Sequence, residues 1–78
     1  MPTVLKVRQF RFFFFSNEGN EPIHIHVESD DKYAKFWLDP VQLTKSVGYG
    51  AKELNEIRKL VLENLNLFKE RWYEHFGR

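Results

Sequence analysis

The stretch Phe10-Arg11-Phe12-Phe13-Phe14-Phe15, followed after a short polar segment by Glu21-Pro22-Ile23-His24-Ile25-His26-Val27-Glu28, decides the fold of this 78-residue chain. Five of the first six residues are aromatic, and the second run alternates apolar and polar side chains, as a strand with one buried face does. The five residues between the runs, 16–20, are of types that tolerate turns. The two runs are therefore predicted to form a hairpin at the centre of a small sheet.

Working outward, the sequence predicts strands on both sides of this hairpin. The predicted strands cover residues 3–8, 10–15, 23–28 and 32–38. In the first strand, alternation puts Thr3, Leu5 and Val7 on one face. The core positions predicted for the other three are Phe10, Phe12, Phe14, Ile23, Ile25, Val27, Ala34, Phe36 and Leu38. Residues 41–49 fit either a short fifth strand or a single helical turn.

Residues 51–76 are predicted to be helical, because their apolar residues recur at spacings of three and four. A straight helix of this length measures about 39 Å, whereas a six-residue strand spans about 20 Å. The helix must therefore kink near Asn64-Leu65-Asn66 or overhang the sheet. Its further apolar positions suggest contact with a second protein or a second copy of the chain: Leu60, Leu62, Leu67 and Tyr73. The predicted fold is α+β, a single domain over 1–78 with a mainly antiparallel sheet of four or five strands and a long C-terminal helix on one face.

Composition restricts the classes of function. Twelve basic and eleven acidic residues give a net charge of +1, so global charge does not favour nucleic acid or membrane. The chain has no cysteine, which excludes disulfides and thiolate metal sites and agrees with a reducing cytoplasm, where we expect the protein to act. The N-terminus does not resemble a signal peptide, and no apolar run is long enough to cross a membrane.

Several motifs together resemble a small prokaryotic family. They are Met1-Pro2-Thr3-Val4, the run from Arg11 to Glu18, Pro22-Ile23-His24-Ile25-His26-Val27, Ala34-Lys35-Phe36-Trp37-Leu38-Asp39-Pro40, Gly48-Tyr49, Lys52-Glu53-Leu54 and Trp72-Tyr73-Glu74-His75-Phe76-Gly77. In this order, and over nearly the whole chain, they are similar to the family called Domain of Unknown Function 4160.

The resemblance implies a compact bacterial α+β domain without an established activity. It also implies a partner, since members are often encoded beside a Domain of Unknown Function 2442 protein in an arrangement that looks like a toxin–antitoxin pair. The chain departs from the family pattern at two positions. Ile23 stands where a second proline is usual, and Gly50 replaces a serine, so the helix start loses a side-chain cap and keeps only the acceptor Glu53.

The sheet face opposite the core, called the far face below, carries the candidate functional residues. Alternation places on it Lys6, Arg8, Arg11, Phe13, Phe15, His24, His26, Glu28, Tyr33, Lys35 and Trp37. Interleaved basic and aromatic side chains suit single-stranded RNA, because bases stack and phosphates pair with cations. Ordinary polar side chains of a solvated sheet face are the competing interpretation.

His24 and His26 lie two residues apart, so their rings point the same way. In one hypothesis they are the general acid and base of a metal-independent ribonuclease, with Arg11, Arg8 or Lys35 stabilising the charged transition state. In a second they bind a metal with Glu28, but a strict strand separates His24 from Glu28 by about 13 Å, so a further ligand such as His75 would be needed. In the third they are structural. No metal or other cofactor is expected.

The leading functional hypothesis is a component of a small two-gene module that acts by protein–protein contact and also by RNA contact. It depends mainly on the family resemblance. The ribonuclease-like enzyme is the alternative.

Overall fold

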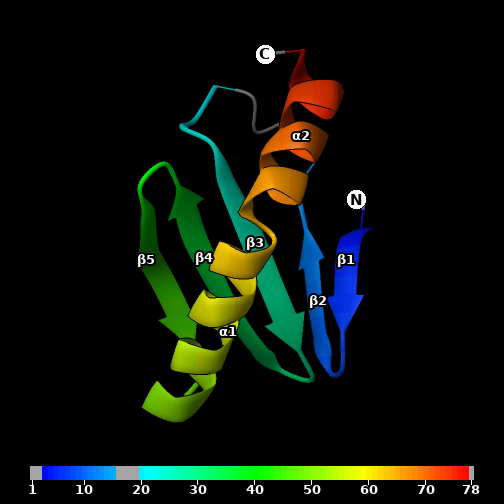
Figure 1. Ribbon diagram of the computed structural model, residues 1–78. Helices are drawn as coiled ribbons and strands as arrows, with labels where there is room; N and C mark the ends of the chain where they lie inside the picture. The colour runs from blue at the N-terminus through cyan, green and yellow to red at the C-terminus, as the bar shows by residue number, and fades with distance from the viewer. Residues whose placement is uncertain (1–2, 16–19, 78) are drawn as a thin grey trace.

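The computed structural model describes residues 3–15 and 20–77. Within them, five strands form one antiparallel sheet in the order β1-β2-β3-β4-β5, and two helices cover one of its faces (Figure 1). The strands are β1 (Thr3–Val7), β2 (Phe10–Phe13), β3 (His24–Ser29), β4 (Lys32–Leu38) and β5 (Val41–Val47), and the helices are α1 (Ala51–Glu63) and α2 (Leu65–Phe76). The predicted α+β class is confirmed. The ambiguous segment after Pro40 is a strand, and β2 is two residues shorter than predicted.

The core lies between the sheet and the helices. The sheet contributes the predicted inward side chains of β2, β3 and β4, with Phe10, Phe12, Ile25 and Val27 fully buried. The helices contribute Ile57, Leu60, Val61, Phe68 and Trp72. Phe12 meets Phe68 with ring centroids 5.2 Å apart, and Phe14 meets Trp72 edge-on at 5.3 Å. Aromatic rings thus supply much of the apolar area that so short a chain needs.

The predicted helix is broken at Asn64, which has φ −113° and ψ 20°. The Asn64 side-chain amide donates to the carbonyl oxygen of Leu60 at 2.8 Å, so it competes with the helical hydrogen-bond ladder. The break lets α2 continue over the sheet in a new direction. A straight helix of about 39 Å would exceed the longest extent of the molecule, 34 Å. The kink, one of the two sequence-based alternatives, is the solution observed.

The first strand departs from strict alternation. Thr3 pairs with Phe13 and Leu5 pairs with Phe12, so Val4 is an extra residue in a β-bulge. The bulge turns Thr3 to the far face, where its hydroxyl accepts a hydrogen bond from Arg11 Nε at 2.9 Å. The prediction that Thr3 shares a face with Leu5 and Val7 is therefore wrong, because one inserted residue reverses every side chain before it.

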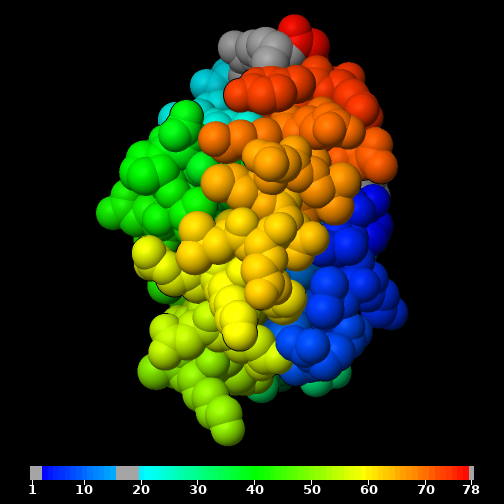
Figure 2. All heavy atoms as spheres, viewed as in Figure 1, coloured from blue at the N-terminus to red at the C-terminus, as the bar shows by residue number. Residues whose placement is uncertain are grey.

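The helices lie over the middle of the sheet and cover its two edge strands less closely, although Leu5 and Val7 of β1 are partly buried against the core. Figure 2 shows the helices along the middle of the molecule, with β5 on one side and β1 on the other. Gly48 ends β5 with φ +89°, a left-handed conformation that leads the chain back toward α1. The sheet thus has a covered centre and two exposed edges, which fixes where contacts with other molecules can form.

Candidate functional site

The far face carries a layer of rings that pack on one another. This aromatic layer consists of Phe13, Phe15, His24, His26, Tyr33 and Trp37. His26 lies at its centre: it stacks on Phe13 at 5.3 Å and on Tyr33 at 5.7 Å, and it meets Phe15 edge-on at 4.7 Å. Strand β3, at the centre of the sheet, is therefore buried on the far face as well, whereas Phe15 at the margin of the layer is 37% exposed.

Both histidines are buried, with exposed fractions of 0% for His24 and 2% for His26. His24 Nδ1 donates to the carbonyl oxygen of Pro22 at 2.8 Å, and its ring also lies 4.9 Å from that of Trp72 on α2. His26 Nδ1 lies 2.6 Å from the Tyr33 hydroxyl oxygen, within hydrogen-bond distance. The two rings are perpendicular, with centroids 5.0 Å apart. Ring packing and a hydrogen bond at Nδ1 hold each histidine in place, which favours the structural hypothesis.

The cations of the far face are held by carboxylates and rings. Arg11 donates to Glu28 at 2.6 Å, and its guanidinium lies 4.5 Å from the centre of the Phe13 ring. Lys35 Nζ donates to Glu21 at 2.7 Å and lies 4.7 Å from the centre of the Trp37 ring. These interactions neutralise two of the cations that were predicted to contact phosphate.

Electrostatics agrees with this neutralisation. The hydrogen bond from Lys35 is the main cause that lowers the pKa of Glu21 below its ordinary value of 4.5. The charges of Lys35, His24 and His26 act in the same direction, and partial desolvation opposes them. The ionised form of Glu21 is therefore favoured by its bond to Lys35.

Two residues predicted to make external contacts have other partners. Arg8 lies in the β1–β2 turn with φ +53°, and its guanidinium pairs with Glu56 of α1, so it belongs to the helix side. Leu60 is 9% exposed and packs in the core. Alternation and periodicity misplaced them because Arg8 lies beyond the end of its strand and Leu60 borders the buried stripe. Lys6 and Lys45 are exposed on the two edge strands and make no ion pair with a described residue.

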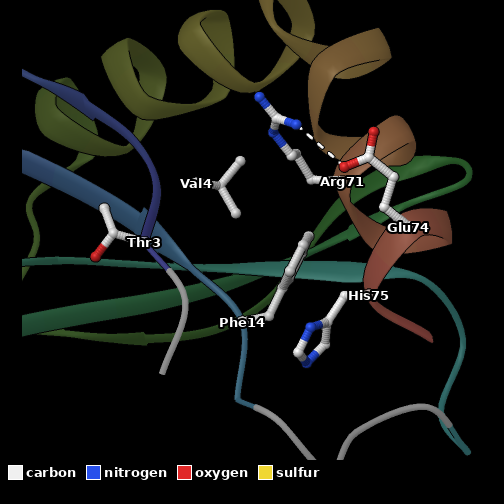
Figure 3. A pocket seen from close by; sticks show the side chains of 6 residues that line it. All are labelled: Thr3, Val4, Phe14, Arg71, Glu74 and His75. Atoms are coloured by element: carbon white, nitrogen blue, oxygen red, sulfur yellow. Dashed lines mark hydrogen bonds and ion pairs between the residues drawn. The ribbon is translucent and has the colours of Figure 1, made fainter.

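The structure contains a pocket of about 270 Å³ between the start of β1 and the last turns of α2 (Figure 3). Its lining residues are Thr3, Val4, Phe14, Arg71, Glu74 and His75. Arg71 and Glu74 form an ion pair at 3.1 Å with each other, and both are about half exposed. The pocket is thus shallow and its charged groups are already paired. Among the described residues, no group of three or more histidine or acidic side chains is placed to hold a metal ion.

The most accessible element is β5, which the sequence left undecided. From Gln42 to Val47 every residue is exposed, and the fraction reaches 38% for Leu43 and 50% for Val47. On the helices, Leu62 and Tyr73 are also half exposed, as the sequence-based partner contact requires, and Leu67 is intermediate. A signal for this surface was present: Val41-Gln42-Leu43-Thr44-Lys45-Ser46-Val47 has strand-forming residues but few large apolar ones.

Comparison with known families gives one match. The model for the domain of unknown function (DUF4160) matches residues 10–73, so the chain belongs to this family. Searches of the curated proteins and of the solved structures found no significant match. Among the described residues, no helix is long and apolar enough to span a membrane.

Proposed function

We propose that this domain is a non-catalytic protein-binding component of a small bacterial two-gene module of the toxin–antitoxin type. The observation that carries the proposal is the open strand β5, in which six consecutive residues are exposed. Leu62 and Tyr73 are exposed on the helices. An uncovered edge strand presents unpaired backbone donors and acceptors, and it is a common site of protein association.

The far face offers little accessible surface for catalysis or RNA binding, which supports a protein-binding function. General acid–base catalysis needs groups within hydrogen-bond reach of the substrate, and both histidine rings are enclosed by the aromatic layer. RNA contact also has less support there. Stacking platforms need accessible ring faces. Phe13 is 2% exposed and Phe15 is 37% exposed, and Arg11 and Lys35 are ion-paired.

The test is formation of a complex between the purified domain and a purified Domain of Unknown Function 2442 protein from the same genome. We expect light scattering to give the mass of a defined complex, or a stable oligomer of the domain itself. The variant Leu62→Lys is expected to weaken that association, because it places a charge in an apolar contact. A domain that is monomeric at all concentrations and binds no such protein would contradict the proposal.

A parallel assay with single-stranded RNA distinguishes the protein-binding module from the ribonuclease-like enzyme. Phosphate contact would give an affinity that falls steeply with salt concentration. RNA cleavage that disappears in His26→Ala, while the variant stays folded, would favour the ribonuclease-like enzyme over the binding module.

A further inference from the structure

The open backbone edge of β5 and the side chains on its two faces restrict what can bind there. In the described part of the chain β5 pairs with β4 alone, so its outer backbone edge is open. Val41 and Leu43 pair with the core residues Leu38 and Phe36 and so lie on the helix side. Lys45 and Val47 pair with far-face residues and lie on the other side. An added strand would therefore meet an apolar row on one side and a cation on the other.

The helices extend this surface. Arg58 and Leu62 on α1, and Lys69 and Tyr73 on α2, each directly follow a buried residue of their own helix. All four therefore border the buried stripe on the same flank; the buried residues are Ile57, Val61, Phe68 and Trp72. All are exposed except Lys69, which is intermediate.

The opposite flank of the helices faces β1. There Glu56 pairs with Arg8, and Arg71 and His75 line the pocket next to Thr3 and Val4. The flank with Leu62 therefore faces the β5 end of the sheet, and Figure 2 shows β5 beside the helices on that side.

The charge of this surface is unbalanced. Lys45, Arg58 and Lys69 make no ion pair with a described residue. Five carboxylates form ion pairs with cations elsewhere: Glu21, Glu28, Glu53, Glu56 and Glu74. Asp39, in the turn before β5, is the acidic residue closest in sequence to the strand. The surface thus combines an open strand edge, exposed apolar side chains and three cations without an ion pair to a described residue. Lys45 Nζ lies 5.9 Å from the centre of the Tyr33 ring, and Glu63 and Glu70 on the helices also make no ion pair with a described residue.

We propose that the β5 edge binds an extended acidic segment of a partner protein, which adds to the sheet as a sixth strand. Its backbone pairs with that of β5, its apolar side chains cover Leu43 on the helix side, and its carboxylates lie beside Lys45 on the other side. This inference depends on the proposed protein-binding function and specifies the surface and the class of partner.

A second copy of the chain fits this edge less well. In an antiparallel self-pair centred on Thr44, the two Lys45 side chains become diagonal neighbours on one face of the sheet. The bulge at Thr44, between the partners of Lys35 and Phe36, further opposes a regular self-pair. RNA would compensate the charge but would leave the strand edge unpaired and Leu43 exposed.

The experiment is selection of peptides from a random displayed library on the immobilised full-length domain, followed by sequencing of the enriched peptides. Three proteins are compared: the parent, Lys45→Glu, and Lys6→Glu as the matched control. Lys6 is also an exposed lysine on an edge strand without an ion pair to a described residue, but it lies on β1. Enriched peptides should alternate apolar and acidic residues on the parent and on Lys6→Glu.

Lys45→Glu should weaken the best enriched peptide by about tenfold, since an exposed attraction becomes a repulsion of similar size. That peptide should also slow hydrogen exchange at β5 amides more than at β1 amides. Enriched peptides without acidic bias, affinity independent of Lys45, or exchange protection at another surface would overturn the β5 proposal and leave the protein-binding function intact. A domain that is a dimer dissolved by Thr44→Pro would show that a second copy occupies the edge instead.

Discussion

Strands β3 and β5 are of similar length but differ in burial. In β3, five of six residues are buried and Glu28 is intermediate, whereas in β5 six of seven are exposed and Val41 is intermediate. Both strands contain polar residues, and β3 even carries two histidines. Position in the sheet, more than composition, therefore decides which strand is enclosed.

The physical cause is that β3 is covered twice. Its helix-side residues Ile25 and Val27 lie in the core with α1 and α2, and its far-side histidines lie in the aromatic layer. Strand β5 has β4 on one side, and its outer edge remains open. Stability is thus concentrated in the centre of the sheet, and the accessible contacts are at the β5 end.

Two side-chain truncations, one in the centre of the sheet and one in β5, test this difference in packing and give the largest expected effect. Phe12→Ala should lower the free energy of unfolding by about 3–5 kcal/mol, because it removes a fully buried ring that contacts Phe68. Leu43→Ala on β5 should lower it by less than about 1 kcal/mol, since that side chain is already 38% exposed. Urea unfolding followed by circular dichroism measures both. Equal losses would show that β5 is as tightly packed as the centre.

The next effect concerns the aromatic layer. His26→Ala should lower the free energy of unfolding by about 2–3 kcal/mol, because it empties the space between Phe13 and Tyr33 and removes a hydrogen-bond partner of the Tyr33 hydroxyl. His75→Ala, an exposed residue at the end of α2, is the matched control and should change stability by less than about 0.5 kcal/mol. A His26→Ala protein as stable as the parent would speak against a structural histidine.

The fold could be predicted further than the site. Alternation from Phe10 to Leu38 identified the core face, and the spacing of three and four identified the helical stripe through Trp72. The bulge at Val4 could not be predicted, because one extra residue leaves no mark in composition. The burial of His26 could not be predicted either, since it depends on rings from three strands that meet only in the folded sheet.

A substitution at Gly48, directly after β5, is expected to have a smaller effect on stability. Gly48→Ala should lower the free energy of unfolding by about 1–2 kcal/mol, because φ +89° is unfavourable for a side chain and the new Cβ would lie 3.0 Å from Lys32 Cγ. Thermal unfolding would measure the loss. An unchanged midpoint would mean that this turn relaxes freely, as an edge without tertiary support would allow.

The smallest effect is a dependence on pH where α1 is attached to the β3–β4 turn. Lys32 donates to Glu53 Oε2 at 2.9 Å, and the Gly50 amide donates to Oε1 at 3.3 Å. The bond from Lys32 is the main cause that lowers the pKa of Glu53 below 4.5, and it raises the pKa of Lys32 above 10.5. A lowered carboxyl pKa stabilises the fold above the unfolded value and loses that effect as the pH falls through the folded value. The raised lysine pKa stabilises the fold below 10.5 and loses its effect as the pH rises further, so the pair acts between these limits.

Glu53→Gln should therefore be slightly less stable than the parent at pH 7, and the difference in urea midpoint should shrink as the pH falls below 4.5. Glu63→Gln is the matched control, because Glu63 is exposed at the end of the same helix and makes no ion pair with a described residue. A difference between Glu53→Gln and parent that is the same at pH 7 and pH 3 would mean that the carboxylate acts by packing alone. The helix start would then be held by Tyr49, whose hydroxyl lies 2.8 Å from Ser29 Oγ, and attachment of α1 would depend on buried contacts, as in the centre of the sheet.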